Sequence, residues 1–419
     1  MNSDNAKAKH YLGVRLVLSL SALLILALCP AASAASRIAK LTVTFTAVPA
    51  PKTTLRVAAL SSVACTSRQF CVAVGPNYSE VTAEKTVSAP TVIDQFNGRV
   101  WTRSKSPSPS AKLNILESVS CSSSTFCLAV GGDEVRGTEV PLTERFNGHS
   151  WSVVSNSTLY PGTPTTSMTM SLSSVSCVSA SFCMAVGTVI RGSSQNGFLY
   201  STVQGQFNGS VWTRSPDSYN GQLTSVSCVS KTSCIAGGQG PPGSVVASFA
   251  DFNGKSWGGL LNYSTPFGKL GPSGASGSAS AITGVSCVKG LFRGTVPSAM
   301  GRLCLVEGWG LPNGRYTPFV GYVTPANGAQ QENPVTFVHH PGLNPVGMAC
   351  VSTGCVVIGK ISNASSSAFA AVFAGAWSLR PTAAPPGGEF IGVACVRTWC
   401  VAVGTVGKSS EGALIEQTT

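Results

Sequence analysis

The stretch Leu172–Gly187 reads LSSVSCVSASFCMAVG, and six other stretches of the 419-residue chain repeat its pattern. Close copies begin at Leu60, Leu116 and Leu223, and weaker copies begin at Ile282, Val346 and Ile391. Recurrence at a spacing of roughly 50 residues is typical of a protein built from one repeated structural unit. The chain therefore contains seven copies of one unit.

Each copy predicts four antiparallel strands. Its first half, LxSVSC, alternates apolar and small polar residues as a half-buried strand does, and FCxAVG predicts a second strand after a short hairpin loop. A second block follows the first four copies and is degraded in the sixth: FNGRVW at Phe96, FNGHSW at Phe146, FNGSVW at Phe207, FNGKSW at Phe252 and FAGAW at Phe373. Asn-Gly is a strong hairpin signal, so this block predicts the turn between strands three and four. The fold class is therefore all-β, a seven-bladed β-propeller of four-stranded blades.

Ring closure is testable on the sequence, because the last copy is one strand short. The chain ends in GALIEQTT, whereas the strand-like segment 41–48 precedes the first copy. We predict that this N-terminal segment completes the last blade. An open β-array or a pair of sandwiches is the alternative, and either would leave strand edges exposed.

The chain has 15 cysteines, and all except Cys29 fall in pairs within the copies. Paired cysteines beside a hairpin in an exported chain predict one structural disulfide per blade. Zinc binding and redox catalysis are the alternatives, but both favour Cys-x-x-Cys spacing. The predicted pairs are Cys65/Cys71, Cys121/Cys127, Cys177/Cys183, Cys228/Cys234, Cys287/Cys304, Cys350/Cys355 and Cys395/Cys400.

The N-terminus has the pattern of a secretory signal peptide. The positively charged residues Lys7, Lys9 and Arg15 precede the apolar stretch 16–28. The small-residue motif Ala-Ser-Ala at 32–34 follows it. This pattern predicts a signal peptide over 1–34, cleaved near Ala34, and a secreted propeller over 35–419. The alternatives are an uncleaved membrane anchor and lipidation at Cys29. No later apolar run is long enough to span a membrane.

Two resemblances accompany the repeat. LAVGGDEV…TERFNGHSW, from Leu128 to Trp151, resembles the kelch and galactose-oxidase type of propeller repeat. The paired-cysteine text with FNGxxW, over residues 60–419, resembles repeat proteins common among the secreted proteins of actinobacteria. Copy five departs most, because it lacks the FNG block. The resemblance implies an architecture and very little about activity.

Variable loops mark the face on which we expect function. The hairpin loops inside LxSVSC…FCxAVG and FNG are nearly uniform, whereas the segments after AVG and between copies differ in length and composition. Propeller topology places these two sets on opposite faces, and variable surface loops are where function usually resides. Candidate ligand-binding residues on the variable face are Tyr78, Asp133, Glu134, Arg136, Arg191, Asn196, Trp309, Arg315 and Tyr316.

Composition narrows the function classes. The formal net charge is +12, but it is spread without a Lys/Arg run or basic stripe, which argues against nucleic-acid binding. The predicted function is binding or adhesion, with a carbohydrate, a cell-wall polymer or a protein as ligand. The alternative is a secreted glycan hydrolase or lyase with a site at the channel mouth. We predict a monomer, and we assign no catalytic residue, no cofactor and no metal site.

Overall fold

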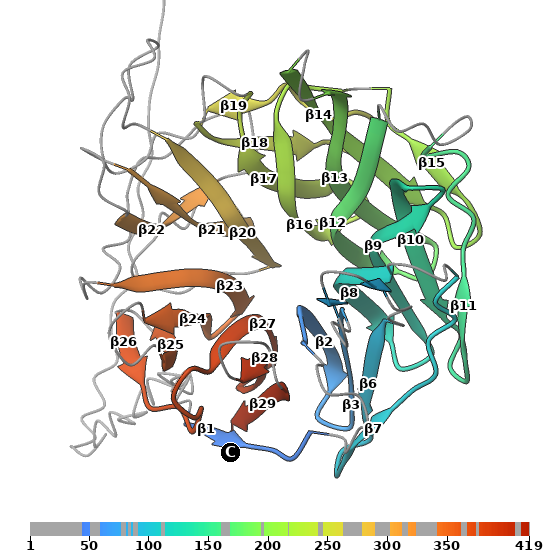
Figure 1. Cartoon of the computed structure of the whole chain (residues 1–419). Coiled ribbons are helices and arrows are strands. Elements are labelled where there is room, and N and C mark those ends of the chain that lie inside the picture. The colour runs from blue at the N-terminus through green and yellow to red at the C-terminus, as the bar shows by residue number, and fades with distance from the viewer. Residues whose placement is uncertain are drawn as a thin grey trace, which may run out of the picture. The chain divides into compact units, whose positions relative to one another are not determined.

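The computed structural model describes residues 44–50, 59–76, 81–82, 85–86, 91–109, 114–160, 168–193, 197–216, 218–241, 246–262, 279–289, 302–311, 317–323, 342–361, 367–373, 377–406 and 412–418. Seven antiparallel sheets follow one another around a ring with a central opening (Figure 1). The first strand of each copy is the innermost. In the described part of the chain, no helix is long and apolar enough to cross a membrane.

The blades follow the chain order of the copies. The strands of blades one to three are β2 (Ser62–Ser67), β3 (Phe70–Gly75), β6 (Val92–Phe96), β7 (Trp101–Arg103); β8 (Asn114–Ser123), β9 (Phe126–Val135), β10 (Thr138–Phe146), β11 (Trp151–Val153); and β12 (Met168–Ser179), β13 (Phe182–Ser193), β14 (Gly197–Phe207), β15 (Trp212–Arg214). A two-stranded ribbon lies between β3 and β6, formed by β4 (Val81–Thr82) and β5 (Lys85–Thr86).

Blade five is the irregular member of the second half, with three strands among its described residues. The strands of blades four to six are β16 (Gln222–Ser230), β17 (Ser233–Gln239), β18 (Ala247–Phe252), β19 (Leu261–Asn262); β20 (Ser280–Lys289), β21 (Arg302–Gly310), β22 (Thr317–Val323); and β23 (Leu343–Val351), β24 (Gly354–Ile361), β25 (Ser367–Phe373), β26 (Trp377–Arg380).

The predicted closure of the ring is confirmed. The last blade has the order β1-β29-β28-β27, with β27 (Glu389–Val396), β28 (Trp399–Val406) and β29 (Gly412–Thr418) from the end of the chain and β1 (Phe45–Ala47) from its start. Phe45 pairs with Thr418 and packs on Phe390, with ring centroids 6.0 Å apart. The N-terminal strand therefore supplies the missing outer strand.

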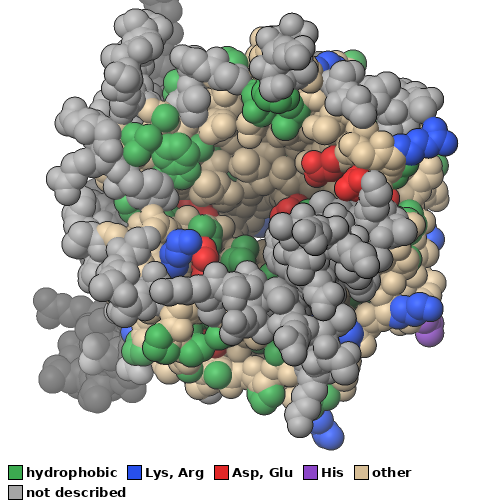
Figure 2. Space-filling view, viewed as in Figure 1, with side chains coloured by type: hydrophobic (Ala, Val, Ile, Leu, Met, Phe, Trp, Pro, Cys, Tyr) green, Lys and Arg blue, Asp and Glu red, His purple; other side chains and the backbone are tan. Residues whose placement is uncertain are grey.

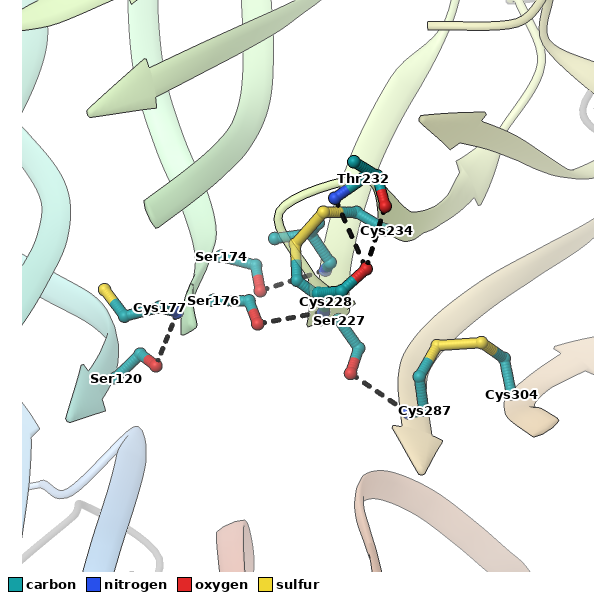
Figure 3. Close-up of a disulfide and its surroundings, with 12 residues drawn as sticks. Ser120, Ser174, Ser176, Cys177, Ser227, Cys228, Thr232, Cys234, Cys287 and Cys304 are labelled. Carbon is teal, nitrogen blue, oxygen red and sulfur yellow. Dashed lines mark hydrogen bonds between the residues drawn. A yellow bond between two sulfur atoms is a disulfide. The ribbon is translucent and has the colours of Figure 1, made fainter. Parts of the chain in front are cut away.

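All seven predicted disulfides form, and each joins directly opposite residues of the first two strands of its blade. In blade three, for example, Cys177 and Cys183 are cross-strand partners with Cα atoms 4.0 Å apart. The same arrangement holds in blade five, although 17 residues separate Cys287 from Cys304. Each disulfide therefore closes one inner hairpin within its own blade (Figure 3). The other five bonds are Cys65–Cys71, Cys121–Cys127, Cys228–Cys234, Cys350–Cys355 and Cys395–Cys400.

The two cysteines of each pair differ in burial, which the sequence did not predict. The first cysteine, on the innermost strand, is half-buried in every blade. The second cysteine begins the apolar FCxAVG strand and lies within the core between blades, so it is not part of an accessible site. These buried cysteines are Cys71, Cys127, Cys183, Cys234, Cys304, Cys355 and Cys400. The burial agrees with a structural role, because a reactive or metal-binding thiol needs access from solvent.

The serines of the SVSC motif bridge neighbouring blades, a role that was not predicted. The hydroxyl of Ser120 accepts a hydrogen bond from the Cys177 N–H of the next blade at 2.9 Å, and Ser176 does the same for Cys228 at 3.0 Å (Figure 3). Ser227 repeats the contact with Cys287 at 3.0 Å. Since the innermost strand is a sheet edge, these bonds satisfy backbone donors that lack a strand partner.

The FNG block forms the predicted turn. In blade two the Asn147 side-chain oxygen accepts hydrogen bonds from the N–H groups of His149 and Ser150, and Gly148 adopts a φ of 96°. Each following Trp packs on the Phe that precedes the turn, as Trp151 does on Phe146 with centroids 5.4 Å apart. The repeat Trp and Phe side chains therefore belong to the core between blades.

Candidate functional site

The variable face is built from extended hairpins where the sequence predicted loops. Strand β9 continues past the AVG motif to Val135, which pairs with Thr138 across a two-residue turn. Both turn residues, Arg136 and Gly137, have positive φ, as a tight type I′ hairpin requires. The second and third strands of blade three extend similarly, as far as the pair Ser193–Gly197. These hairpins hold their side chains on regular sheet rather than on irregular loops.

The predicted site residues that the structure describes lie on three blades. Asp133 and Glu134 lie on β9, and Arg136 lies at the tip of its hairpin. Arg191 lies on β13 and donates to the Ser201 hydroxyl at 3.2 Å. Four other predicted residues lie outside the described residues: Tyr78, Asn196, Arg315 and Tyr316.

Trp309 occupies a different setting from the one that we expected. It belongs to β21 rather than to the loop after it, and it pairs with Ala281 on one side and Pro318 on the other. Its side chain is half-buried. It lies on blade five, so it is not part of the polar region of blade two described next.

Carboxylates gather on blade two, beside the central opening (Figure 2). Glu134 and Glu139 are cross-strand partners, so their side chains lie on the same face of the β9–β10 hairpin. Gly132 makes room for one of them, because a Cβ at that position would lie 2.4 Å from the Glu139 Oε1. Glu117, on the innermost strand β8, interacts electrostatically with Glu139. Three carboxylates therefore share one side of the channel mouth.

The pKa values of two of these carboxyls are raised. For Glu117, removal of the carboxylate from bulk water by the surrounding channel wall raises the pKa, and the Glu139 charge raises it further, although the side chain stays open to the channel. For Glu139, burial raises the pKa, and a hydrogen bond with Ser171 of blade three partly offsets this effect. Two neighbouring carboxyl groups with raised pKa values are groups of the kind that general acid–base catalysis uses.

Glu117 and Glu139 were missed from the sequence, although one of them left a signal. The residue before the SVSC serine is Ser61, Ser173, Thr224 and Thr283 in four copies, and Glu117 alone is acidic. A charged residue at one position of a uniform repeat marks that copy as different. Glu139 has no comparable marker, since the segment around it varies in every copy.

A pocket of about 310 Å³ lies on the same blade and reaches Asp133. Its walls combine the aliphatic side chains of β10 and β11 with polar groups of the segment that leads to blade three. Asn156 fixes that segment, because it accepts from the Thr143 hydroxyl at 2.8 Å and donates to the Pro141 carbonyl at 2.8 Å. The lining residues are Pro109, Asp133, Val140, Pro141, Leu142, Val153, Val154, Ser155, Asn156, Ser157 and Tyr160.

Two further buried carboxyls do not line this pocket, although the charge of Asp133 acts on one of them, Glu144. Glu144, at the junction of blades one and two, accepts from the Ser106 hydroxyl at 3.0 Å, and burial raises its pKa to about 7. Glu307, opposite Gly284 in blade five, is fully buried, and neither of its oxygens has a hydrogen-bond partner among the described residues. Burial raises the pKa of Glu307 to about 8, so its carboxyl is mostly protonated at neutral pH.

Within the described residues, no three His, Cys, Asp or Glu side chains form a group that could hold a metal ion. The carboxylates of blade two therefore do not form a recognisable metal centre. Their chemistry is that of hydrogen-bond acceptors and of proton donors or acceptors.

Seven disulfide-containing repeats in a closed ring of antiparallel sheets define a β-propeller, and its distant structural relatives include a lectin and a glycan-acting hydrolase. The chain resembles YCF48 bound to D1 peptide, with 11% identity, a TM-score of 0.49, and coverage of 90% of this chain and 96% of the other. It also resembles the Penicillium chrysogenum alpha-L-arabinanase complexed with arabinobiose, with 10% identity, a TM-score of 0.47, and coverage of 89% of this chain and 97% of the other. The BP39L lectin from Burkholderia pseudomallei is similar with 13% identity, a TM-score of 0.46, and coverage of 85% of this chain and 95% of the other.

Likenesses at this distance say nothing about what this chain binds or converts. No family model and no curated protein matches the chain. The seven disulfides indicate an oxidising environment outside the cytosol.

Proposed function

We propose that this chain is a secreted binding protein that holds a neutral saccharide on the variable face of blade two. The observation that carries the proposal is the pocket of about 310 Å³ that reaches Asp133. Its size lies at the lower end of ligand pockets and suits one or two sugar rings. Secretion follows from the leader-like N-terminus together with the disulfides.

The lining of the pocket offers a sugar both apolar contacts for its C–H groups and hydrogen-bond partners for its hydroxyls. The C–H face of a sugar ring packs on aliphatic surface, which Val140 and Val153 provide. Its hydroxyls donate hydrogen bonds, and the Asp133 carboxylate is an acceptor whose charge strengthens such bonds. Ser155 and Ser157 add hydroxyls that both donate and accept.

Charge selects among the ligand classes that the sequence left open. Glu134 and Glu139 share one face of the β9–β10 hairpin and Asp133 lies on the other, so both faces carry negative charge that disfavours polyanions. An anionic cell-wall polymer is therefore disfavoured here despite the net charge of +12. A neutral glycan meets no such repulsion. The kelch-like and actinobacterial character of the repeat and the monomeric state stay predictions.

Glycan hydrolysis is the second candidate, and the carboxyl pair at the channel mouth favours it. A glycosidase needs two carboxyl groups, one of them with a raised pKa so that it can donate a proton. Glu117 and Glu139 both have raised pKa values and interact with each other. Binding ranks first because the pocket of about 310 Å³ reaches the carboxylate of Asp133 and not this pair, and a glycosidase needs two carboxyl groups at its site.

The test is a panel of neutral glycans presented to the purified chain, with release of reducing sugar measured in parallel. We expect saturable binding without turnover, weakened about tenfold or more by D133N and unaffected by D251N in blade four. Turnover that E139Q abolishes would establish the hydrolase instead. Binding that survives D133N unchanged would contradict the proposal for this pocket.

A further inference from the structure

A second pocket, of about 460 Å³, lies at the junction of blades one and two beside the FNG turn of blade two. It is not part of the variable face, since the FNG hairpin and the β9–β10 hairpin lie at opposite ends of the blade. Its lining residues are Gln95, Ser104, Lys105, Pro107, His149, Ser150 and Trp151.

One lining residue, Gln95, occupies a repeat position that carries an arginine in blade two and a glutamine again in blade three, Gln206. Gln95 and Arg145 occupy the same place, immediately before the Phe of the FNG block, and their partners Val72 and Leu128 follow the second cysteine. Arg145 crosses to the next blade, where its Nη1 donates to the carbonyl of Gly209 in the FNG turn at 3.0 Å. The shorter Gln95 leaves the corresponding space beside the FNG turn of blade two open.

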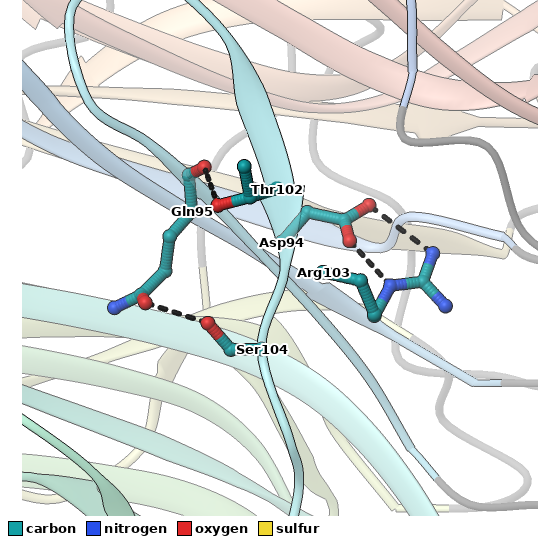
Figure 4. Close-up of polar contacts among 5 residues, drawn as sticks. All are labelled: Asp94, Gln95, Thr102, Arg103 and Ser104. Atoms are coloured by element: carbon teal, nitrogen blue, oxygen red, sulfur yellow. Dashed lines mark hydrogen bonds and ion pairs between the residues drawn. The ribbon is translucent and has the colours of Figure 1, made fainter.

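The polar groups around this space are mostly donors. The Gln95 side-chain oxygen already accepts from the Ser104 hydroxyl at 2.6 Å, and Figure 4 shows the amide nitrogen directed away from that contact. The Trp151 Nε1 is buried and has no partner among the described residues. Lys105 is exposed and makes no ion pair with any residue that the structure describes.

The nearby carboxylates are turned elsewhere. Asp94 lies on the opposite side of β6 from Gln95, where it pairs with Arg103 (Figure 4). Glu144 is engaged by the hydroxyls of Ser106 and Thr91, and it does not line the pocket. None of the seven lining residues is acidic. The site therefore offers one positive charge and several neutral donors to whatever enters it.

From this arrangement we propose that the junction of blades one and two is a binding site for a compact oxyanion, such as a sulfate, phosphate or carboxylate group carried by a small polar molecule. Lys105 provides the charge, and the Gln95 amide and the Ser150 hydroxyl provide hydrogen bonds, while the ring of Trp151 forms part of the wall. A site with one cation and no anion favours such a group over a neutral ligand. The pocket is also large enough to take a monosaccharide that carries one.

The test follows the indole N–H resonance of Trp151 in the full-length chain, titrated with sodium sulfate, sodium phosphate, glucuronate and glucose at constant ionic strength. We expect a saturable shift with at least one anionic probe and none with glucose. Binding of glucuronate alone would identify a carboxylated sugar, and binding of sulfate or phosphate alone would identify a sulfate or phosphate ester. A shift with glucose equal to that with glucuronate would overturn the proposal.

Two variants and a control sharpen the test. K105M should raise the dissociation constant about tenfold or more, since it removes the ammonium group from the lining of the pocket. Q95M should also weaken binding and keep the fold, because it removes the amide donor from a side chain of similar length. K231M removes an exposed lysine from another hairpin and should change nothing. Equal weakening by K105M and K231M would show counterion binding only and would overturn the site.

Discussion

The ring is joined in two different ways along its circumference. From blade one to blade six, serine side chains of one inner strand accept hydrogen bonds from the next inner strand, for example Ser62 from Val119 and Ser286 from Cys350. At the last two junctions, the matching positions are Gly347 and Ala349, then Gly392 and Ala394, which have no hydroxyl. We call the first region the serine arc and the second the seam.

At the seam, close contact between the backbones of neighbouring blades takes the place of the side-chain hydrogen bonds of the serine arc. A Cβ on Gly392 would lie 2.8 Å from the Cα of Ser62, so blade seven packs against blade one too closely for a serine. Trp399 stacks on Phe96 across the same junction with centroids 6.1 Å apart, and Phe70 makes the equivalent contact with Phe146 in the serine arc, also at 6.1 Å. The comparison teaches that apolar packing joins the blades in both regions, whereas the serine arc adds polar bridges and the seam adds close approach of the backbones.

The largest expected effect is at the seam. Phe45 is almost fully buried against Phe390, so F45A should lower the free energy of unfolding by about 3–5 kcal/mol, by loss of contacts and creation of a cavity. Thermal unfolding followed by circular dichroism measures it. F198A is the control, because Phe198 is half exposed on the hairpin of blade three. Equal effects of the two variants would show that the closing strand contributes little.

The next effect is expected at the junction of blades five and six, where the serine arc weakens. Gly284 replaces the first serine there because Glu307 fills the space, and a Cβ at residue 284 would lie 2.5 Å from its carboxyl oxygen. The folded protein holds the Glu307 proton up to about pH 8, whereas the unfolded chain releases it near the usual pKa of 4.5. Stability should therefore fall as the pH rises between these values.

E307Q tests that pH dependence. It should leave stability at low pH nearly unchanged and make the protein more stable than the parent by a few kcal/mol at pH 8. Urea unfolding at several pH values measures the difference. E389Q, at a partly exposed ion pair of Glu389 with Lys360, is the control variant for loss of a carboxylate. Parallel pH profiles for the parent and E307Q would contradict the assignment.

A smaller effect is expected within the serine arc. S120A removes the acceptor of the Cys177 N–H and should cost about 1 kcal/mol, the usual net value of one hydrogen bond. S176A should cost a similar amount, because its bond to the Cys228 N–H is equivalent. S210A in an exposed FNG turn is the control. If both variants match S210A in chemical denaturation, the bridges do not stabilise the ring.

The smallest effect would come from extending the arc into the seam. A394S places a hydroxyl where Ser120 has one in blade two, facing the Cys65 N–H of blade one, and should add about 0.5 kcal/mol. A precise denaturation midpoint detects a change of this size. Destabilisation by A394S would instead show that the seam has no room even for one hydroxyl.

The architecture was readable from the sequence because the information was repeated. Seven cysteine pairs, four FNG turns and the missing last strand each pointed to the same ring. The serine bridges were not predicted, since a half-buried polar residue in a strand has the same pattern whether it faces solvent or the next blade. The extension of β9 to Val135 and the inclusion of Trp309 in β21 were missed, because strand ends depend on hairpin pairing rather than on local composition.

The candidate site was predicted less well. Asp133 and Glu134 were selected from the sequence, but their partners Glu139 and Glu117 were not. Their association depends on strand register and on the approach of blade three, neither of which one copy of the repeat encodes. The pocket beside Lys105 was missed because it depends on how two neighbouring blades approach each other, and glutamine at the position of Gln95 also occurs in blade three, as Gln206.

The placement of the disulfides has a consequence for how such a chain can change over generations. Every bond lies within one blade, and none crosses a junction or the seam. A duplication or deletion of one whole copy therefore adds or removes both cysteines of a pair together. The number of blades can therefore change without leaving an unmatched thiol in any copy.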